Sequence, residues 1–361
     1  MLARLLSYDF PRSTPLAVLL ALALLGLLSA PFVFPGVKAL GVAAKILIFI
    51  VLAASFDLLL GYTGIVSFAH TMFFGIGAYG IAIAAHRLGP GWDALGLGAL
   101  AALALSLTLA LLIGVVSLRV RAIFFAMITL AVAAAFQTLA SQFSELTGGE
   151  DGLSFRIPAL LTSATRFLPD PLLGVTIDGR LLSYYLLFLV SAGLFLIMLR
   201  IVNSPFGRVL QAIRDNEFRA EAIGYRVVVF RTLSSLLSAF FATLAGMLLA
   251  VWLRYNGPDT SLSFEIMMDV LLIVVIGGMG TLYGAVLGAT VFMIAQAYLQ
   301  DLLQLLAQTS AAVPLLAALF SPDRWLLWMG LLFVCAVYFF PNGIVGELRK
   351  LAHQPIRLRS R

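Results

Sequence analysis

The sequence predicts an all-α fold, namely a polytopic integral membrane protein with about ten transmembrane helices. Hydrophobic residues make up 62% of the 361 residues and charged residues only 11%, whereas about 25% of the residues of a soluble domain are charged. Apolar runs of about 20 residues, long enough to cross a hydrocarbon core of roughly 30 Å, recur along nearly the whole chain. Lipid is therefore the predicted solvent.

The predicted spans lie between charged residues and breaks rich in Gly or Pro. Two Gly-rich junctions, 61–64 and 277–284, fit a broken or re-entrant helix equally well, so the total is eight to eleven. The first span follows Arg4 and Arg12 and could be a signal peptide, but the many later spans favour an uncleaved anchor. The ten spans are 16–34, 39–60, 65–86, 94–117, 122–143, 181–199, 232–253, 265–283, 284–306 and 325–340.

The distribution of basic residues predicts the orientation. With both termini in the cytoplasm, the cytoplasmic loops carry about twice as many Arg and Lys residues as the outer ones, as the positive-inside rule requires. Residues 1–361 then form a single transmembrane domain. Its longest cytoplasmic loop is 204–231, and 145–180 is the outer loop.

Several classes of function are excluded by what the sequence lacks. The net charge of +6 belongs to connecting loops, so nucleic-acid binding is not expected. A GxGxxG pattern at 75–80 lies inside an apolar span and is not a dinucleotide site. Neither HExxH nor GxSxG nor a phosphate-binding loop occurs, and the single cysteine, Cys335, is expected to be a small core residue. We therefore expect no catalysis, no metal site and no cofactor in this chain.

Two stripes of small residues predict close helix packing, because small side chains let backbones approach in membranes. One is a GxxxGxxxG series and the other has a four-residue spacing. Spacing leaves open whether they pack within the chain or against a second subunit. The stripes are Gly280, Gly284 and Gly288, and Ser238, Ala242, Gly246 and Ala250.

Polar and titratable residues at membrane depth are candidates for a substrate path, because their burial is costly unless they are paired or face water. Ser67, His70 and Thr71 fit the lumen-facing side of one helix, but His70 fits a satisfied core histidine as well. Asp269 follows Glu265 by four residues, so both share a face, either in a wet vestibule or at a specific ligand. The path candidates are Asp57, Ser67, His70, Thr71, Glu265 and Asp269.

Four segments carry a family resemblance. They are Asp57 to Tyr79, Ser204 to Gly224 with the small-residue helix through Gly246, Gly277 to Gly284, and Pro341 to Gly346. In this order they resemble the LivM-type permeases of branched-chain amino acid ABC importers, over about residues 45–346. Asp57 departs from the family, which more often has a neutral polar residue such as Asn there. This leaves open a shifted substrate preference or an ion pair with Lys45.

The resemblance implies a non-enzymatic permease of a bacterial inner membrane. It implies a heterodimer with a second related permease, two cytoplasmic ATPase subunits and a periplasmic substrate-binding protein. The substrate would be a branched-chain amino acid, urea, an amide or an aromatic acid. The alternative is a secondary transporter or facilitator without an ATPase, for which two similar halves with paired broken helices are typical.

The resemblance also favours loop 204–231 as the element that couples the permease to its ATPase; the alternative is an ordinary positive-inside loop. Ser204-Pro205 is a typical helix start, and apolar residues follow at helical spacing. We expect the apolar positions to enter a groove on the ATPase, with Arg208 and Arg214 at its rim. The coupling candidates are Phe206, Arg208, Leu210, Ile213, Arg214 and Gly224.

Overall fold

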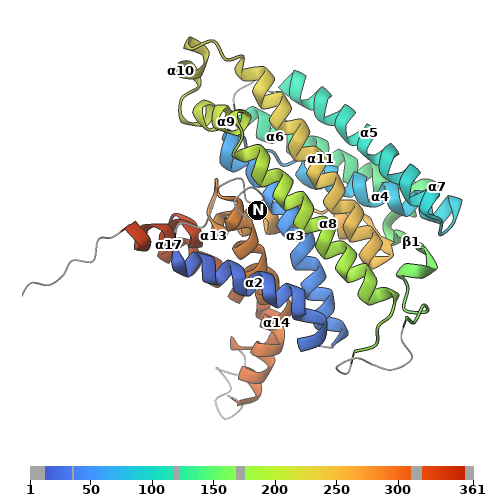
Figure 1. Cartoon of the computed structure of the whole chain (residues 1–361). Coiled ribbons are helices and arrows are strands. Elements are labelled where there is room, and N and C mark those ends of the chain that lie inside the picture. Colours follow the sequence, from blue (N-terminus) through green and yellow to red (C-terminus); the bar gives the residue numbers. More distant parts are fainter. Residues whose placement is uncertain (1–12, 35, 118–121, 168–174, 310–318, 354–361) are drawn as a thin grey trace, which may run out of the picture.

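The computed structural model describes residues 13–34, 36–117, 122–167, 175–309 and 319–353, and long helices dominate them (Figure 1). Nine segments of these residues are long and apolar enough to cross a membrane. A tenth helix, α4, packs along α11 and α5. The long helices are α2 (Thr14–Val33), α3 (Val37–Thr63), α4 (His70–Leu88), α5 (Trp92–Ser117), α6 (Ala122–Gln142), α8 (Gly179–Val202), α11 (Val227–Leu253), α13 (Phe264–Gly277), α14 (Leu282–Thr309) and α16 (Trp325–Phe339).

These ten helices correspond one to one to the ten predicted spans, which confirms an all-α, multi-pass membrane protein. The shorter elements connect them. They are α7 (Ser144–Thr147), η1 (Gly149–Asp151), β1 (Leu153–Ser154), η2 (Ala159–Leu161), α9 (Pro205–Asp215), α10 (Glu217–Ala222), β2 (Tyr255–Asn256), α12 (Pro258–Ser261), η3 (Pro322–Arg324) and α17 (Gly343–His353).

Helix α3 forms the centre of the bundle. Its most apolar stretch is 72% buried, against 22% for α2 and for α6. A helix that is apolar all round belongs inside a protein, whereas a lipid-facing helix needs only one packed side. Helices α11, α14 and α8 surround α3, and α4 lies between α11 and α5.

The stripe on α11 packs within the chain. Its four small residues are all buried. A Cβ at Gly246 would overlap the carbonyl oxygen of Phe74 on α4, and a Cβ at Gly77 would overlap that of Thr243. The backbones of α4 and α11 are therefore in direct contact, which side chains would prevent.

The GxxxGxxxG series is only partly helical. Gly284 and Gly288 lie on α14 against the backbone of α13, at Gly277 and Ile273. Gly280 precedes α14 and has a positive φ of 78° in the break after α13. The prediction of a packed seam thus holds for two of the three glycines and is wrong for Gly280, because the chain turns before the helix begins.

Both predicted Gly-rich breaks exist, with shifted bounds. Helix α3 continues through Gly61 and is capped by Gly64 in the left-handed conformation, so the first break is 64–69. Ser67 consequently lies in the break. The prediction that Ser67 shares a helix with His70 is therefore wrong. Cys335 is exposed on α16 and is not a core residue.

The two ends of the bundle differ. Helices α9 and α10 lie at one end, called the inner end below, and β1 lies at the opposite, outer end (Figure 1). At the outer end β1 pairs antiparallel with β2, which ties the described part of loop 145–180 to the segment after α11. The loop is closed further by a bridge between Arg166 and Asp178 just before α8.

Candidate functional site

The inner end holds a cluster that we call the inner junction: Asp57, Gly61, Arg214 and Gly280. The Asp57 carboxylate is buried in α3, with 1% of the residue exposed. Its Oδ1 accepts a hydrogen bond of 2.8 Å from the backbone N–H of Gly280. The positive φ of Gly280 turns this amide toward α3 in the break between α13 and α14. The Asp57 carboxylate therefore joins the central helix α3 to the break between α13 and α14.

Arg214 of α9 completes the junction. Its Nη1 donates a hydrogen bond to the carbonyl oxygen of Gly61 in the last turn of α3. Carbonyls of a last turn have no partner within the helix, and a cation is favoured there. The charge of the same guanidinium also acts on Asp57, whose Oδ2 is buried and has no hydrogen-bond partner among the described residues. The prediction that Arg214 sits at the rim of a partner groove is wrong, because its guanidinium reaches back into its own chain.

Helix α9 begins as predicted. Ser204 is its N-cap, with Oγ accepting from Gly207 N at 3.4 Å, and Pro205 follows. Leu210 and Ile213 are buried, and α9 contacts α3, α8 and α11. They cannot enter a groove on another subunit, contrary to our prediction, because other parts of the same chain cover them. Ile213 packs against Ala220 of α10 and Val227 of α11.

Phe206 is also held within the chain. Its ring stacks on that of Phe230 at the start of α11, with 5.7 Å between the centroids. Next to it, the Arg231 guanidinium and the Glu217 carboxylate form two hydrogen bonds, of 2.8 and 2.9 Å. Such a two-point contact restricts orientation as well as distance. The segment from α9 to α11 is thus a braced unit.

The exposed apolar residues of this segment lie on and after α10 instead. Phe218 is 84% exposed and Ile223 is 72% exposed. Arg219 and Arg226 beside them are exposed too, and Gly224 turns the chain after α10 with a φ of 96°. We call Phe218, Arg219, Ile223 and Arg226 the α10 patch.

The α10 patch was not predicted, because only the apolar residues at helical spacing between Phe206 and Ile213 indicated a helix in this loop. Asn216 ends α9 and caps α10, with Oδ1 accepting from Arg219 N at 3.0 Å. Asn followed by an acidic residue in the first turn is a helix-start signal. This signal at Asn216 predicts two helices in the loop rather than one. Phe218 would then have been assigned to a separate surface.

His70 is a core residue that joins three helices. Its Nε2 lies 2.9 Å from Ser55 Oγ of α3, and its Nδ1 lies 3.5 Å from Ser238 Oγ of α11. The Phe56 ring lies 5.3 Å from the imidazole. With 2% exposure and partners on both nitrogens, His70 fits the satisfied core histidine of the two alternatives.

This arrangement predicts that His70→Leu destabilises the fold by about 1–3 kcal/mol, since it removes the polar link between α3, α4 and α11. The measurement is thermal unfolding in detergent. His86→Gln is the matched control at the exposed end of the same helix and should change stability by less than about 0.5 kcal/mol. A His70→Leu protein with normal stability but no transport would instead assign His70 to the substrate path.

The two acids of α13 lie toward the outer end. Glu265 is exposed and Asp269 is half-buried. Asp269 Oδ2 accepts a hydrogen bond of 3.2 Å from Gln296 of α14. The charge of Lys45 acts on Asp269. Among the described residues no ion pair joins Lys45 to Asp57. Exposed charge at membrane depth is compatible with water or another subunit but not with acyl chains.

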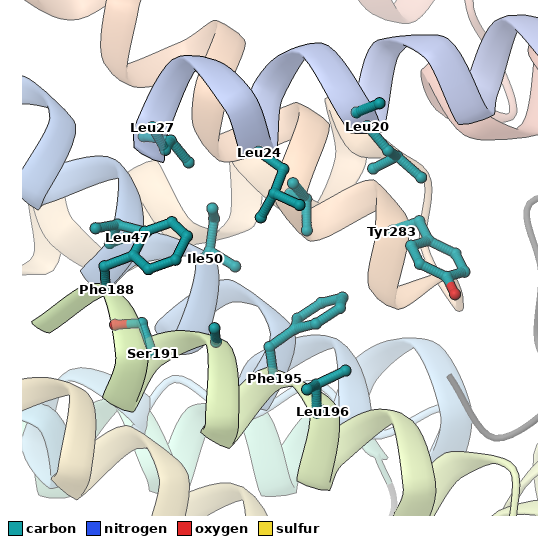
Figure 2. Close-up of a pocket in the computed structure, with 13 residues that line it drawn as sticks. Leu20, Leu24, Leu27, Leu47, Ile50, Phe188, Ser191, Phe195, Leu196 and Tyr283 are labelled. Atoms are coloured by element: carbon teal, nitrogen blue, oxygen red, sulfur yellow. The ribbon is translucent and has the colours of Figure 1, made fainter. Parts of the chain in front are cut away.

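Thr71 is buried, and together with Phe68, Gln137 and Phe264 it lines a cavity of about 330 Å³. A second cavity, of about 350 Å³, lies among α2, α3, α8 and α14. Figure 2 shows its walls, which are almost entirely aliphatic and aromatic side chains. Apolar walls suit lipid chains and not a polar solute, so the cavity of Figure 2 is not a candidate for the substrate path. Thr71, which lines the other cavity, remains a candidate.

The model of one protein family matches residues 38–337. Its description is "Branched-chain amino acid transport system / permease component". The chain belongs to this family. A high-affinity branched-chain amino acid transport system permease protein LivM of Salmonella typhimurium is 30% identical over 275 residues, which cover 72% of this chain and 63% of the relative. The corresponding LivM of Escherichia coli is 29% identical over the same shares.

A more distant member is the probable branched-chain amino acid transport permease protein LivM of Methanocaldococcus jannaschii, 26% identical over 171 residues that cover 47% of each chain. This chain spans 63% of the length of the two bacterial relatives. No solved structure matches it significantly. Family membership thus agrees with the resemblance that the motifs carried.

Proposed function

We propose that this protein is the permease subunit of an ABC importer for branched-chain amino acids or related small solutes. It lies in a bacterial inner membrane with both termini in the cytoplasm, and the inner end is the cytoplasmic end. Its partners are a second related permease, two ATPase subunits and a periplasmic substrate-binding protein. Family membership supports the class. The observation that carries the mechanism is the hydrogen bond from Arg214 to the last turn of α3.

Coupling follows from the bracing of the inner end. The α10 patch is the exposed part, and an ATPase subunit docks on it through Phe218 and Ile223. Movement of α10 is transmitted to α11 by the contact of Glu217 with Arg231, and to α3 by Arg214. Asp57 extends the connection to the break before α14. A movement of the ATPase subunit is thus transmitted to α3 and to the break between α13 and α14 through direct hydrogen bonds.

The substrate path runs beside α13. Glu265 presents an exposed carboxylate on α13, and the half-buried Asp269, which accepts a hydrogen bond from Gln296, follows one turn later. Contact between a charged group and acyl chains is unfavourable, so the second permease faces this side of α13 and the path lies between the two subunits. A zwitterionic solute finds polar groups there that the cavity of Figure 2 does not offer.

The decisive test is uptake of labelled leucine into vesicles containing the purified complex, with ATP at the ATPase side, with ADP, or with a proton or sodium gradient alone. We expect uptake only with ATP, and no ATP hydrolysis by this chain alone, since it has no phosphate-binding loop. Uptake driven by an ion gradient without any ATPase would establish the secondary-transporter alternative instead.

Replacement of the α10 patch tests the docking surface. Phe218→Ala should lower recovery of the ATPase with the permease about tenfold, because exposed aromatic residues dominate interface energy. The readout is co-purification from detergent together with ATP hydrolysis. Val229→Ala, an exposed apolar position on α11 beyond the α10 patch, is the matched control and should bind normally. Equal recovery for both variants would contradict docking at this patch.

A further inference from the structure

The outer end holds a polar cavity of about 230 Å³ between the start of α8, the end of α11 and the outer loop. We call it the arginine pocket. Two guanidinium groups, an indole ring and two serine hydroxyls contribute to its wall. Its lining residues include Ser163, Arg180, Ser183, Trp252 and Arg254. None of these residues takes part in the inner junction or in the acidic face of α13.

The walls of the arginine pocket are held in place by hydrogen bonds. Ser183 Oγ donates to the carbonyl of Leu161 at 2.8 Å, and Arg254 Nη2 donates to the same carbonyl at 3.2 Å. Gly179 N donates to Thr165 O at 2.9 Å, which closes the loop on the start of α8. The outer loop is thus fastened to both helices that carry the arginines, and the pocket is built before any ligand arrives.

Arg254 is held in an uncommon backbone conformation. It has a φ of 58°, the one positive value at a non-glycine residue in the described part of the chain. Its own carbonyl accepts from Phe155 N at 3.2 Å. The left-handed conformation is unfavourable for a residue with a Cβ. These contacts hold the backbone of Arg254, and the hydrogen bond to Leu161 holds its guanidinium.

The charges of the pocket are incompletely satisfied. Arg254 Nε is buried and has no hydrogen-bond partner among the described residues. Burial, and after it the positive charge of Arg180, lowers the pKa of Arg254, and Asp178 opposes this shift. The Arg180 guanidinium lies 5.6 Å from the centroid of the Trp252 ring. Asp178 cannot serve both arginines fully, since its Oδ1 caps α8 at Leu181 N.

We propose that the arginine pocket binds one anionic oxygen group, a carboxylate or a phosphate. Such a group can accept hydrogen bonds from the guanidinium groups of Arg254 and Arg180, which match both anions through paired hydrogen bonds. A cation is excluded by the two like charges. The walls are mostly polar and offer little contact to an apolar side chain, so the pocket recognises the charged group alone.

Trp252 provides the readout, since an anion that draws Arg180 from the indole changes its emission. Trp92→Phe, Trp325→Phe and Trp328→Phe leave Trp252 as the sole tryptophan of the four. In nanodiscs of phosphatidylcholine, acetate and L-leucine should give a saturable change, and L-leucinamide, which lacks the carboxylate, should not. Nanodiscs containing phosphatidylglycerol test the other source, because a headgroup phosphate would already occupy the pocket and abolish the response to acetate.

Two variants make the test specific. Arg254→Asn keeps a residue that tolerates the left-handed conformation but lacks the guanidinium, and should weaken acetate binding at least about tenfold. Asp178→Asn preserves the cap of α8, removes the competing carboxylate and should tighten binding. The proposal is overturned if acetate gives no saturable response and phosphatidylglycerol leaves the emission of Trp252 unchanged. It is also overturned if Arg254→Asn binds acetate like the parent. These outcomes do not depend on ATP or transport.

Discussion

Gly246→Ala is expected to destabilise the protein by about 3 kcal/mol, one of the two largest effects predicted here. The added Cβ would overlap the carbonyl oxygen of Phe74, which belongs to the backbone of α4 and cannot rotate away as a side chain can. Helices α4 and α11 must then separate along their common seam. The measurement is the midpoint of thermal unfolding in detergent together with the yield of monodisperse protein.

Gly193→Ala on α8 is the matched control. A Cβ there would meet no heavy atom within 4 Å, and alanine favours helix over glycine by up to about 1 kcal/mol. This variant should unfold at the same temperature or slightly higher. If Gly246→Ala were as stable as Gly193→Ala, the direct contact between the backbones of α4 and α11 would be refuted.

Arg214→Ala is expected to lower substrate-stimulated ATP hydrolysis and uptake together by about tenfold, because it removes a charge-assisted contact to α3. It also leaves the buried Asp57 carboxylate without the cation that faces it. Gln211→Ala, an exposed position on the same helix that is not a coupling candidate, is the control and should change both rates less than about twofold. The two rates are measured on the reconstituted complex.

A double variant separates the two roles of Arg214. Asn at position 57 can still accept the Gly280 N–H but needs no cation, so Asp57→Asn alone should be mild. We expect Arg214→Ala to lower stability as well, because it leaves a buried carboxylate without a nearby positive charge. Combined with Arg214→Ala, Asp57→Asn should recover part of this stability while coupling stays low. Additive effects of the two substitutions would mean that the residues do not interact. Full transport by Arg214→Ala would contradict coupling through Gly61.

Length and apolarity were sufficient to place the spans, because a helix in lipid must satisfy its own backbone and reach across the bilayer. The glycines of 61–64 and 277–284 located both breaks to within a few residues. Helical spacing of Leu210 and Ile213 correctly indicated a buried face. It could not indicate what buries that face, because spacing describes one helix and not its neighbours.

The inner junction could not be predicted for a different reason. Arg214 and Gly61 are 153 residues apart, and Asp57 and Gly280 are 223 apart. Two of the four groups are backbone atoms, and the hydrogen bonds of a backbone atom cannot be read from the residue type. The sequence showed only that Asp57 was costly at its position. The glycine at 280 suggested helix packing, whereas its freedom of φ serves a turn.

The packing of α9 has a consequence for protein engineering. Because Arg214 binds the last turn of α3, and α9 packs against α3 and α8, loop 204–231 is not an exchangeable module. Transplanted alone into another permease, it would lose the carbonyl of Gly61 and the surfaces of α3 and α8 that shape it. A chimera that redirects this subunit to a foreign ATPase should therefore exchange only the solvent-facing residues of α10 and keep the host scaffold beneath them.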